Sequence, residues 1–247
     1  MRFQNKSVIV TGAAQGMGRA YADAFAAEGA RVALFDRNAE GVEAAAKGIR
    51  QAGGSVFGVG VDITDEAGIV SAVARVEEEH GGVDVLVNNA GLHLGDYNEC
   101  IALDFEKWRE IFEVNVLGQL GCVRACRPSL ARSQGVVVNQ SSNSAYLGVG
   151  AYSITKLALN GLTTSLAREL GPEGIRVVGI APGLVDTEAT TARLAKEIHA
   201  TVLSNQIIPR KGKYSEMVGT VMFLASDDAG FITGQTVTAD GGWIQRL

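Results

Sequence analysis

The sequence predicts an α/β fold, with a single, doubly wound parallel sheet of about seven strands and helices on both faces. Short apolar, β-branched runs alternate along the chain with helical patterns, which is typical of parallel strands joined by crossover helices. Several candidate site residues fall at the carboxyl ends of these strands, where ligands bind in such folds. These residues are Gly12, Asp36, Asn88, Ser142 and Pro182.

The elements follow one another without a linker or an internal repeat. Strands are predicted at 7–11, 31–36, 55–60, 83–88, 134–141, 175–181 and 235–239 because these runs are apolar and β-branched. Helices are predicted between them, for example at 19–28, 39–52, 65–80, 105–130 and 151–170. We therefore expect one domain over residues 1–247, with a substrate lid at about 187–212.

The composition favours one domain and excludes several function classes. A hydrophobic content of 47% in 247 residues is ample for a core. The net charge is −5 without a long basic cluster, so no nucleic-acid partner is expected. No apolar run reaches about 18 residues and no signal peptide precedes the first strand, so no membrane association is expected. Three cysteines without a Cys-x-x-Cys motif suit a reducing cytoplasm.

The first strand, Lys6–Thr11, opens directly into a glycine-rich turn, which a helix follows. This order is typical of a dinucleotide site, because glycine lets the backbone approach a pyrophosphate that then rests on a helix amino terminus. A glycine turn that only packs is the alternative. The candidate cofactor residues of the turn are Gly12, Gln15, Gly16, Met17 and Gly18.

Asp36 ends the second strand and indicates which dinucleotide is bound. A carboxylate here can accept hydrogen bonds from the adenine-ribose diol and would repel a 2′-phosphate. Gln15 offers no positive charge to such a phosphate, whereas the neighbouring Arg37 could contact one. The sequence therefore predicts NAD rather than NADP, with a capping or surface aspartate as the alternative.

Tyr152 and Lys156 lie four residues apart in a predicted helix, so their side chains share one face. A free tyrosine has a pKa of about 10 and transfers protons poorly at neutral pH. A fixed cation nearby favours the phenolate and lowers that pKa. The pair therefore predicts general acid–base chemistry, although the same spacing also arises by chance in helices.

In their order, these motifs resemble the short-chain dehydrogenase/reductase family from about Lys6 to Trp243. The resemblance implies a Rossmann-like fold and an NAD-dependent alcohol dehydrogenase or ketone reductase. It implies that Tyr152 transfers the proton and that Lys156 lowers the pKa of Tyr152 and holds the nicotinamide ribose. Ser142 would bind the substrate oxygen, and Asn115 would hold a water that links Lys156 to solvent. The implied catalytic residues are Asn115, Ser142, Tyr152 and Lys156.

Further cofactor contacts are implied by the resemblance. Asp62-Ile63 resembles an adenine-contacting dipeptide, and Asn88-Asn-Ala-Gly91 resembles the segment that stabilises the sheet beside the cofactor. Pro182-Gly183 and Thr187 resemble the segment that binds the nicotinamide carboxamide. In addition to the glycine turn, Asp36 and Arg37, the implied cofactor residues are Asp62, Ile63, Asn89, Ala90, Gly91, Tyr152, Lys156, Pro182, Gly183, Val185 and Thr187.

One spacing departs from the family pattern. Ser142 and Tyr152 are ten residues apart, whereas the family commonly places about a dozen or slightly more between serine and tyrosine. The loop Asn143–Gly150 is therefore interpreted as shortened. Ser141 is the alternative to Ser142, and only one of them can address the site because adjacent strand residues face opposite sides.

The candidate pocket walls predict a neutral substrate. Leu94, Tyr146, Leu147, Val149 and Leu184 carry no charge, so we expect a largely apolar secondary alcohol or its ketone. In the lid, an apolar stripe either faces inward or packs onto the domain. The stripe contains Leu194, Ile198, Val202, Leu203 and Ile207, and the candidate substrate contacts are His93, Ser144, Tyr146 and Leu184.

The remaining expectations concern assembly, metals and alternative functions. The resemblance implies a homotetramer, formed through the helices at 105–130 and 151–170 and the last strand. No metal is expected, since Cys122 and Cys126 lack partner ligands and are interpreted as packing residues. His80 is predicted as a surface cap and His199 as solvated. The alternatives are an NADP-dependent 3-oxoacyl-thioester reductase and a non-catalytic NAD-binding regulator.

Overall fold

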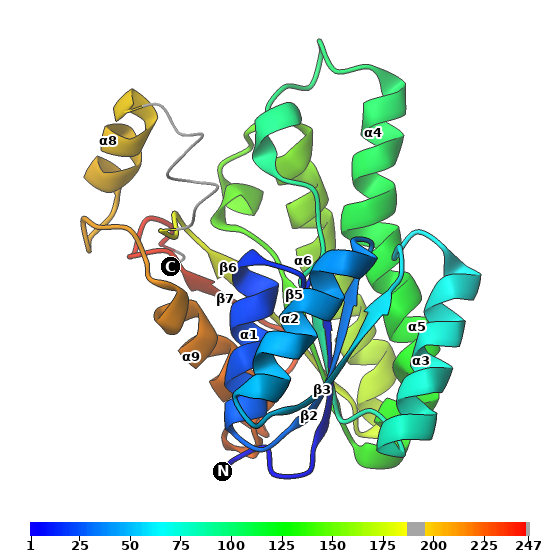
Figure 1. Cartoon of the computed structure of the whole chain (residues 1–247). Helices are drawn as coiled ribbons and strands as arrows, with labels where there is room; N and C mark the ends of the chain where they lie inside the picture. Colours follow the sequence, from blue (N-terminus) through cyan, green and yellow to red (C-terminus); the bar gives the residue numbers. More distant parts are fainter. Residues whose placement is uncertain (187–195, 246–247) are drawn as a thin grey trace.

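One parallel sheet of seven strands organises the part of the chain that the computed structural model describes, residues 1–186 and 196–245. The strand order is β3-β2-β1-β4-β5-β6-β7, and it reverses between β1 and β4 (Figure 1). The predicted Rossmann-like, doubly wound fold is therefore confirmed. The strands are β1 Ser7–Thr11, β2 Arg31–Asp36, β3 Ser55–Gly60, β4 Val85–Asn88, β5 Val136–Gln140, β6 Arg176–Pro182 and β7 Thr236–Ala239.

Helices cover both faces of the sheet, and alternating strand residues fill two cores (Figure 1). In β1, Val8 and Val10 pack against one set of helices, whereas Ile9 packs against the other. Because both faces are covered, every residue of β1 is buried and the strand is almost continuously apolar. The first face carries α1 Gly16–Ala27, α2 Ala39–Gln51 and α9 Tyr214–Ala225; the second carries α3 Glu66–His80, α5 Gln119–Ser133 and α6 Gly150–Leu170.

Most predicted elements are present, with small shifts at their ends, but one predicted helix is divided. The region 105–130 forms α4 Phe105–Phe112, a π-helical segment η2 Glu113–Gly118, and then α5. Of the predicted lid, residues 187–195 lie outside the described residues, and α8 Lys196–Asn205 follows them. Within the described ranges, no helix has the length and apolar character needed to cross a membrane. The short 3-10 turns are η1 Leu94–Asp96, η3 Asn143–Tyr146, η4 Gly171–Glu173 and η5 Asp227–Ala229.

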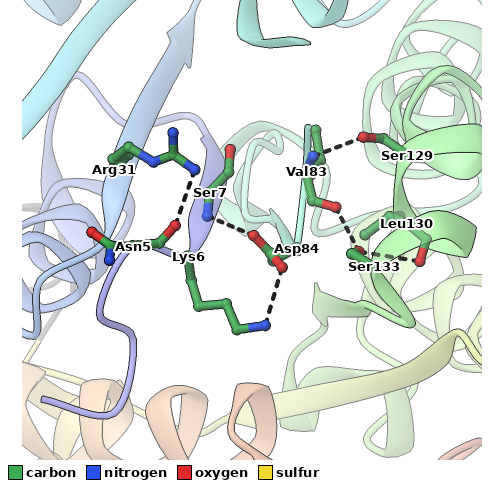
Figure 2. A network of polar contacts seen from close by, with 9 residues as sticks. All are labelled: Asn5, Lys6, Ser7, Arg31, Val83, Asp84, Ser129, Leu130 and Ser133. Carbon is green, nitrogen blue, oxygen red and sulfur yellow. Dashed lines mark hydrogen bonds and ion pairs between the residues drawn. The ribbon is translucent and has the colours of Figure 1, made fainter. Parts of the chain in front are cut away.

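Polar contacts tie the strands together at the amino end of the sheet (Figure 2). The Asp84 carboxylate accepts a hydrogen bond from the Ser7 backbone N–H at 2.8 Å and one from Lys6 Nζ at 3.1 Å. Arg31, the first residue of β2, donates from its guanidinium to the Asn5 carbonyl at 3.0 Å. These bonds fix where β1, β2 and β4 start relative to one another.

His80 lies beside this network, and the prediction that it is a surface cap is wrong. It is the last residue of α3 and is buried, with Nδ1 3.1 Å from Ser7 Oγ and its ring edge-on to Phe57. Burial, together with the positive charge of Arg31, lowers the pKa of His80 to about 4. The histidine is therefore neutral in the folded protein near neutral pH.

This histidine should make the protein sensitive to mild acid. In the unfolded chain its pKa is about 6.5, so between that pH and about 4 the unfolded state binds more protons than the folded state. The free energy of unfolding should fall as the pH decreases through this window, by up to about 3 kcal/mol. Urea unfolding of the wild type and of His80→Gln at about pH 7 and about pH 5 measures this contribution. An equal pH dependence in both proteins would contradict it, and His93→Gln, at an exposed histidine, is the control.

Candidate active site

The glycine turn after β1 is held against the turn after β4, at the point where the strand order reverses. Thr11 Oγ1 accepts hydrogen bonds from the backbone N–H groups of Asn89 and Ala90, both at 3.0 Å. The Asn89 side-chain amide donates to the carbonyls of Thr11 and Gly12 at 2.9 and 3.1 Å. Asn89 therefore connects the two turns, which border a crevice site in folds of this kind.

Two glycines of the turn are required by close contacts. Gly12 has φ +65°, and a Cβ there would lie 2.8 Å from Ala90 Cα. A Cβ on Gly18 would lie only 2.2 Å from the Gly12 carbonyl oxygen. Gly16 differs, because the space in front of it is open at the amino end of α1. The turn thus leaves room for a phosphate group at the helix amino terminus, with Gln15 and Met17 on either side.

Asp36 lies at the end of β2 beside the glycine turn. Its Oδ2 accepts from the Ala14 N–H and its Oδ1 from the Asn38 N–H, both at 3.0 Å. These bonds hold the carboxylate in place and leave lone pairs of both oxygens for a ligand hydroxyl. The adjacent Arg37 is exposed. The structure thus places the predicted ribose-binding carboxylate next to the predicted pyrophosphate turn.

The predicted adenine dipeptide follows β3. Asp62 is exposed, and its Oδ1 accepts from the N–H and hydroxyl of Thr64 at 2.9 and 2.8 Å. Ile63 is buried against Gly118, where a Cβ would lie 2.8 Å from the Ile63 carbonyl oxygen. The π-helical segment and the dipeptide therefore pack closely, which sets the position of Asp62.

Asn115 lies in the π-helical segment and is completely buried. Its Oδ1 accepts from the Leu92 N–H at 2.7 Å, and its Nδ2 donates to the Leu92 carbonyl and to Thr155 Oγ1, both at 3.2 Å. The side chain thus joins the chain after β4 to α6. π-Helical turns are frequent at functional sites, since they shift side chains relative to a regular helix.

Lys156 is buried on α6, and its Nζ donates to the Gln140 carbonyl at 2.8 Å. Burial lowers the pKa of Lys156 to about 8. The ammonium lies 5.7 Å from the centroid of the Tyr152 ring. A Cβ on Gly91 would lie 3.5 Å from Nζ, so the backbone after β4 also approaches this group.

Tyr152 meets Ser142, whose hydroxyl hydrogen-bonds the phenol. Burial raises the pKa of Tyr152, and the hydrogen bond with Ser142 opposes this shift. The Lys156 ammonium is held by the Gln140 carbonyl and lies on the same side of α6 as the Tyr152 ring. That Lys156 lowers the Tyr152 pKa stays a prediction.

The choice between the two serines is decided by their partners. The Ser141 hydroxyl donates to the Lys156 carbonyl at 3.2 Å and is buried. Ser142 instead contacts the phenol of Tyr152 and accepts from the Ser144 N–H at 3.2 Å. Ser142 is therefore the serine that addresses the site, and the three-dimensional arrangement brings Asn115, Ser142, Tyr152 and Lys156 together around α6.

The predicted nicotinamide segment follows β6. A Cβ on Gly183 would lie 2.7 Å from Asp240 Cβ, so this turn packs tightly on the turn after β7. Val185 is buried and pairs with Gly212. Pro182 is buried at the end of β6, whereas Thr187 lies outside the described residues.

The candidate substrate residues are dispersed around this region. Tyr146 accepts a hydrogen bond on its hydroxyl from Asn160 Nδ2 at 2.8 Å, which turns that oxygen toward α6. Leu184 and Ser144 are half-buried, and His93 is exposed at the start of η1. In the predicted lid stripe, Val202 and Leu203 are half-buried, but Ile207 is 68% exposed and does not face inward. Leu194 lies outside the described residues, as does the side chain of Ile198.

Two partners of the site residues, Gln140 and Leu92, were not predicted from the sequence. Gln140 supplies the carbonyl that holds Lys156, and its Oε1 accepts from the buried Tyr21 hydroxyl at 2.7 Å. Leu92 supplies the backbone partners of Asn115. Backbone partners leave no signal in the residue type, so only the position of Gln140 next to the serines could have pointed to it.

Two of the three cysteines serve packing, whereas Cys100 is exposed. Cys122 and Cys126 are buried on α5, and burial raises the pKa of both thiols, that of Cys122 to about 12. Within residues 1–186 and 196–245, no group of three or more His, Cys, Asp or Glu residues gathers as a metal-binding cluster.

Known proteins resemble this chain over almost its entire length. Residues 12–244 match the family model described as enoyl-(acyl carrier protein) reductase. An uncharacterized oxidoreductase of Mycobacterium tuberculosis is 44% identical, with 99% of each chain covered. Meso-2,3-butanediol dehydrogenase of Serratia marcescens is 35% identical (98% and 96% covered), and 3-oxoacyl-[acyl-carrier-protein] reductase of Staphylococcus aureus is 34% identical (96% and 97%).

A solved structure of similar fold is 7α-hydroxysteroid dehydrogenase in complex with NADH and 7-oxo glycochenodeoxycholic acid. It superposes with a TM-score of 0.92 and 32% identity, covering 100% of this chain and 97% of the other. The chain therefore belongs to the short-chain dehydrogenase/reductase family. It is an oxidoreductase whose fold accepts a nicotinamide cofactor, and its relatives include both alcohol dehydrogenases and an acyl-thioester reductase.

The glycine turn gives a direct test of the cofactor site. In Gly18→Ala, the new methyl group would collide with the Gly12 carbonyl, so the turn must move. NADH binding, measured by fluorescence titration, should weaken by at least about tenfold, or about 1.4 kcal/mol. Gly161→Ala is the matched control, because this helical glycine has open space around it and should bind NADH normally. Equal affinity of the two variants would contradict the assignment.

Proposed function

We propose that the protein transfers a hydride between NAD(H) and a neutral, largely apolar secondary alcohol or its ketone. The observation that carries this proposal is the meeting of Tyr152, Ser142 and Lys156 at the carboxyl end of the sheet, next to the glycine turn. The nicotinamide, when bound, supplies the hydride acceptor or donor. The chain supplies position and proton transfer.

In the direction of oxidation, Tyr152 as phenolate takes the proton of the substrate hydroxyl. Ser142 hydrogen-bonds the same substrate oxygen and stabilises the charge that develops on it. Lys156, held by the Gln140 carbonyl, binds the nicotinamide ribose and supports the phenolate electrostatically. Asn115 keeps the chain after β4 fixed against α6 and, as the family resemblance implies, holds a water through which the proton reaches solvent.

NAD is the proposed cofactor because Asp36 is fixed beside the glycine turn. Two backbone N–H groups orient its carboxylate, so it can accept from the ribose diol and repel a 2′-phosphate. The competing cation is the exposed Arg37, which could contact such a phosphate. The 7α-hydroxysteroid dehydrogenase structure holds NADH, and this also favours NAD.

Basic side chains near the site are paired with carboxylates of the protein, and this favours a neutral substrate. Arg210 donates to both oxygens of Glu216 at 2.9 and 2.6 Å, and Lys211 lies 3.2 Å from an Asp186 oxygen. These two basic side chains of the predicted lid are thus engaged with carboxylates, which makes them weaker partners for a substrate anion. Together with the uncharged candidate wall residues, this favours an alcohol or ketone without a carboxylate or phosphate.

The alternative function is an NADP-dependent 3-oxoacyl-thioester reductase, which the similarity to the Staphylococcus aureus enzyme supports. A non-catalytic NAD-binding regulator is disfavoured by the assembled tetrad. We further propose a homotetramer, because α6 and the π-helical segment before α5 expose apolar side chains next to the site. Leu157 is 53% exposed on α6, and Leu117, just before α5, is 50% exposed. Light scattering would measure the mass against 25.9 kDa for one chain. A cytoplasmic location is proposed because the sequence has three cysteines and no Cys-x-x-Cys motif.

A substrate panel tests the proposed function. Neutral cyclic and aryl alcohols, hydroxy acids and 3-oxoacyl thioesters are assayed with NAD(H) and NADP(H). We expect the highest kcat/KM with a neutral alcohol or ketone and NAD(H). In Asp36→Ala, the ratio of kcat/KM with NAD(H) to that with NADP(H) should decrease. Higher kcat/KM with acids or thioesters, or with NADP(H), would contradict the corresponding part of the proposal.

Tyr152→Phe tests the proton-transfer step. The change removes the phenol oxygen but keeps the ring, so the fold and cofactor binding should be preserved. Turnover should fall by about 10²–10⁴-fold, the usual contribution of general acid–base catalysis. Steady-state kinetics and NADH titration of the same variant measure both quantities. A variant that keeps most of its activity would remove Tyr152 from this role.

A further inference from the structure

A short segment after β4 lies across the first turn of α6, where Tyr152 is located. We call residues 97–99 the strap. We propose that Tyr97 is a positioning residue for Tyr152, because it anchors the strap on α4 and the strap in turn fixes the start of α6. The inference rests on the proposed role of Tyr152 in proton transfer.

The strap satisfies backbone donors that helices usually leave open. The first N–H groups of an α-helix have no partner within the helix, and a polar side chain at the N-cap commonly accepts one of them. The N-cap of α6 is Val149, which cannot do so. Instead, the Ala151 N–H donates to the Glu99 carbonyl and the Tyr152 N–H donates to the Tyr97 carbonyl, both at 3.1 Å. The backbone of the reactive tyrosine is thus bonded directly to the strap.

Gly150 allows this contact. It has φ +68°, and a Cβ there would lie 2.2 Å from the Asn98 carbonyl carbon and 2.5 Å from the Tyr97 carbonyl oxygen. No other residue type fits this position without moving the strap or the helix. The connection from Ser142 ends at this glycine, which is the first residue of α6, so the strap supports the helix where it begins.

Tyr97 holds the strap on α4. Its side chain is 5% exposed, and its hydroxyl donates to Glu110 Oε2 at 2.7 Å. The ring packs in a small cluster of its own, separate from the two sheet cores, and Lys107 Nζ lies 5.6 Å from the ring centroid. The cluster contains Tyr97, Ile111 and Ala151, with Leu92, Leu103, Trp108, Phe112 and Tyr152 packed against it.

The consequence for chemistry follows from the partners of the phenol. The hydrogen bond from Ser142 opposes the rise in Tyr152 pKa that burial causes. If the first turn of α6 loosens, this bond lengthens and the phenol oxygen moves relative to the substrate oxygen. Both changes slow proton transfer, whereas the glycine turn that binds the cofactor lies on other elements and keeps its geometry.

Two substitutions remove the hydrogen bond between Tyr97 and Glu110, one at its donor and one at its acceptor. Tyr97→Phe removes the hydroxyl, and Glu110→Leu removes its acceptor on an exposed helix position. Each should lower kcat by about tenfold, as expected for a small misplacement of a reacting group, with NADH affinity unchanged. Glu110→Gln keeps an oxygen that can accept from the Tyr97 hydroxyl, so its kcat should stay close to that of the wild type. Glu106→Leu makes the same change at another exposed position of α4 and is the matched control.

The pH titration of Tyr152, followed by the 13Cζ signal of labelled tyrosine, separates positioning from mere stability. The chain has five tyrosines, and Tyr152→Phe assigns the signal. The pKa of Tyr152 should rise by about one unit in Tyr97→Phe and Glu110→Leu but not in the two controls. Variants that lower only the melting temperature, with kcat and this pKa unchanged, would overturn the proposal. If the wild type shows no turnover, the proposed function fails, while the NMR comparison still decides the role of Tyr97.

Discussion

The structure depends on the hydrogen bonds that join the turn after β1 to the turn after β4. Asn89 and Thr11 exchange bonds across the point where the strand order reverses. The helices that follow β1 and β4 leave toward opposite faces of the sheet, so the two turns would otherwise be free to separate. Because of these bonds, the glycine turn, Asp36 and the chain leading to Leu92 keep one relative position, which is the arrangement that the proposed cofactor site requires.

A second constraint acts on α6, which carries both the phenol and the ammonium. Burial raises the pKa of Tyr152 and lowers that of Lys156, so it disfavours the charged form of each group. The chain offsets this with few contacts, namely Ser142 on the phenol and the Gln140 carbonyl on the ammonium. An oxidised nicotinamide cofactor would add a positive charge to the site, and this charge would favour the phenolate further. A site of this kind links proton transfer to cofactor binding.

The helix α6 is held from three directions, and each contact comes from a different part of the chain. Thr155 contacts Asn115 in the π-helical segment, Lys156 contacts β5, and Tyr152 contacts the strap. The loop between Ser142 and Tyr152 supplies no side-chain cap for the first turn of the helix, because the N-cap residue is Val149. The strap compensates for this, since its carbonyls take the place of an N-cap side chain.

By itself, the sequence determined the alternation of strands and helices, because buried parallel strands must be continuously apolar. It also determined the glycine turn and the Tyr152–Lys156 pair, since these depend on local geometry within one turn or one helix. The tertiary structure decided which serine faces the phenol, that His80 is buried, and that the helix after residue 105 is interrupted by a π-helical segment. It also supplied Gln140, Leu92 and Tyr97 as partners. These contacts are made by backbone atoms or across long sequence separations, and neither leaves a pattern in the order of residue types.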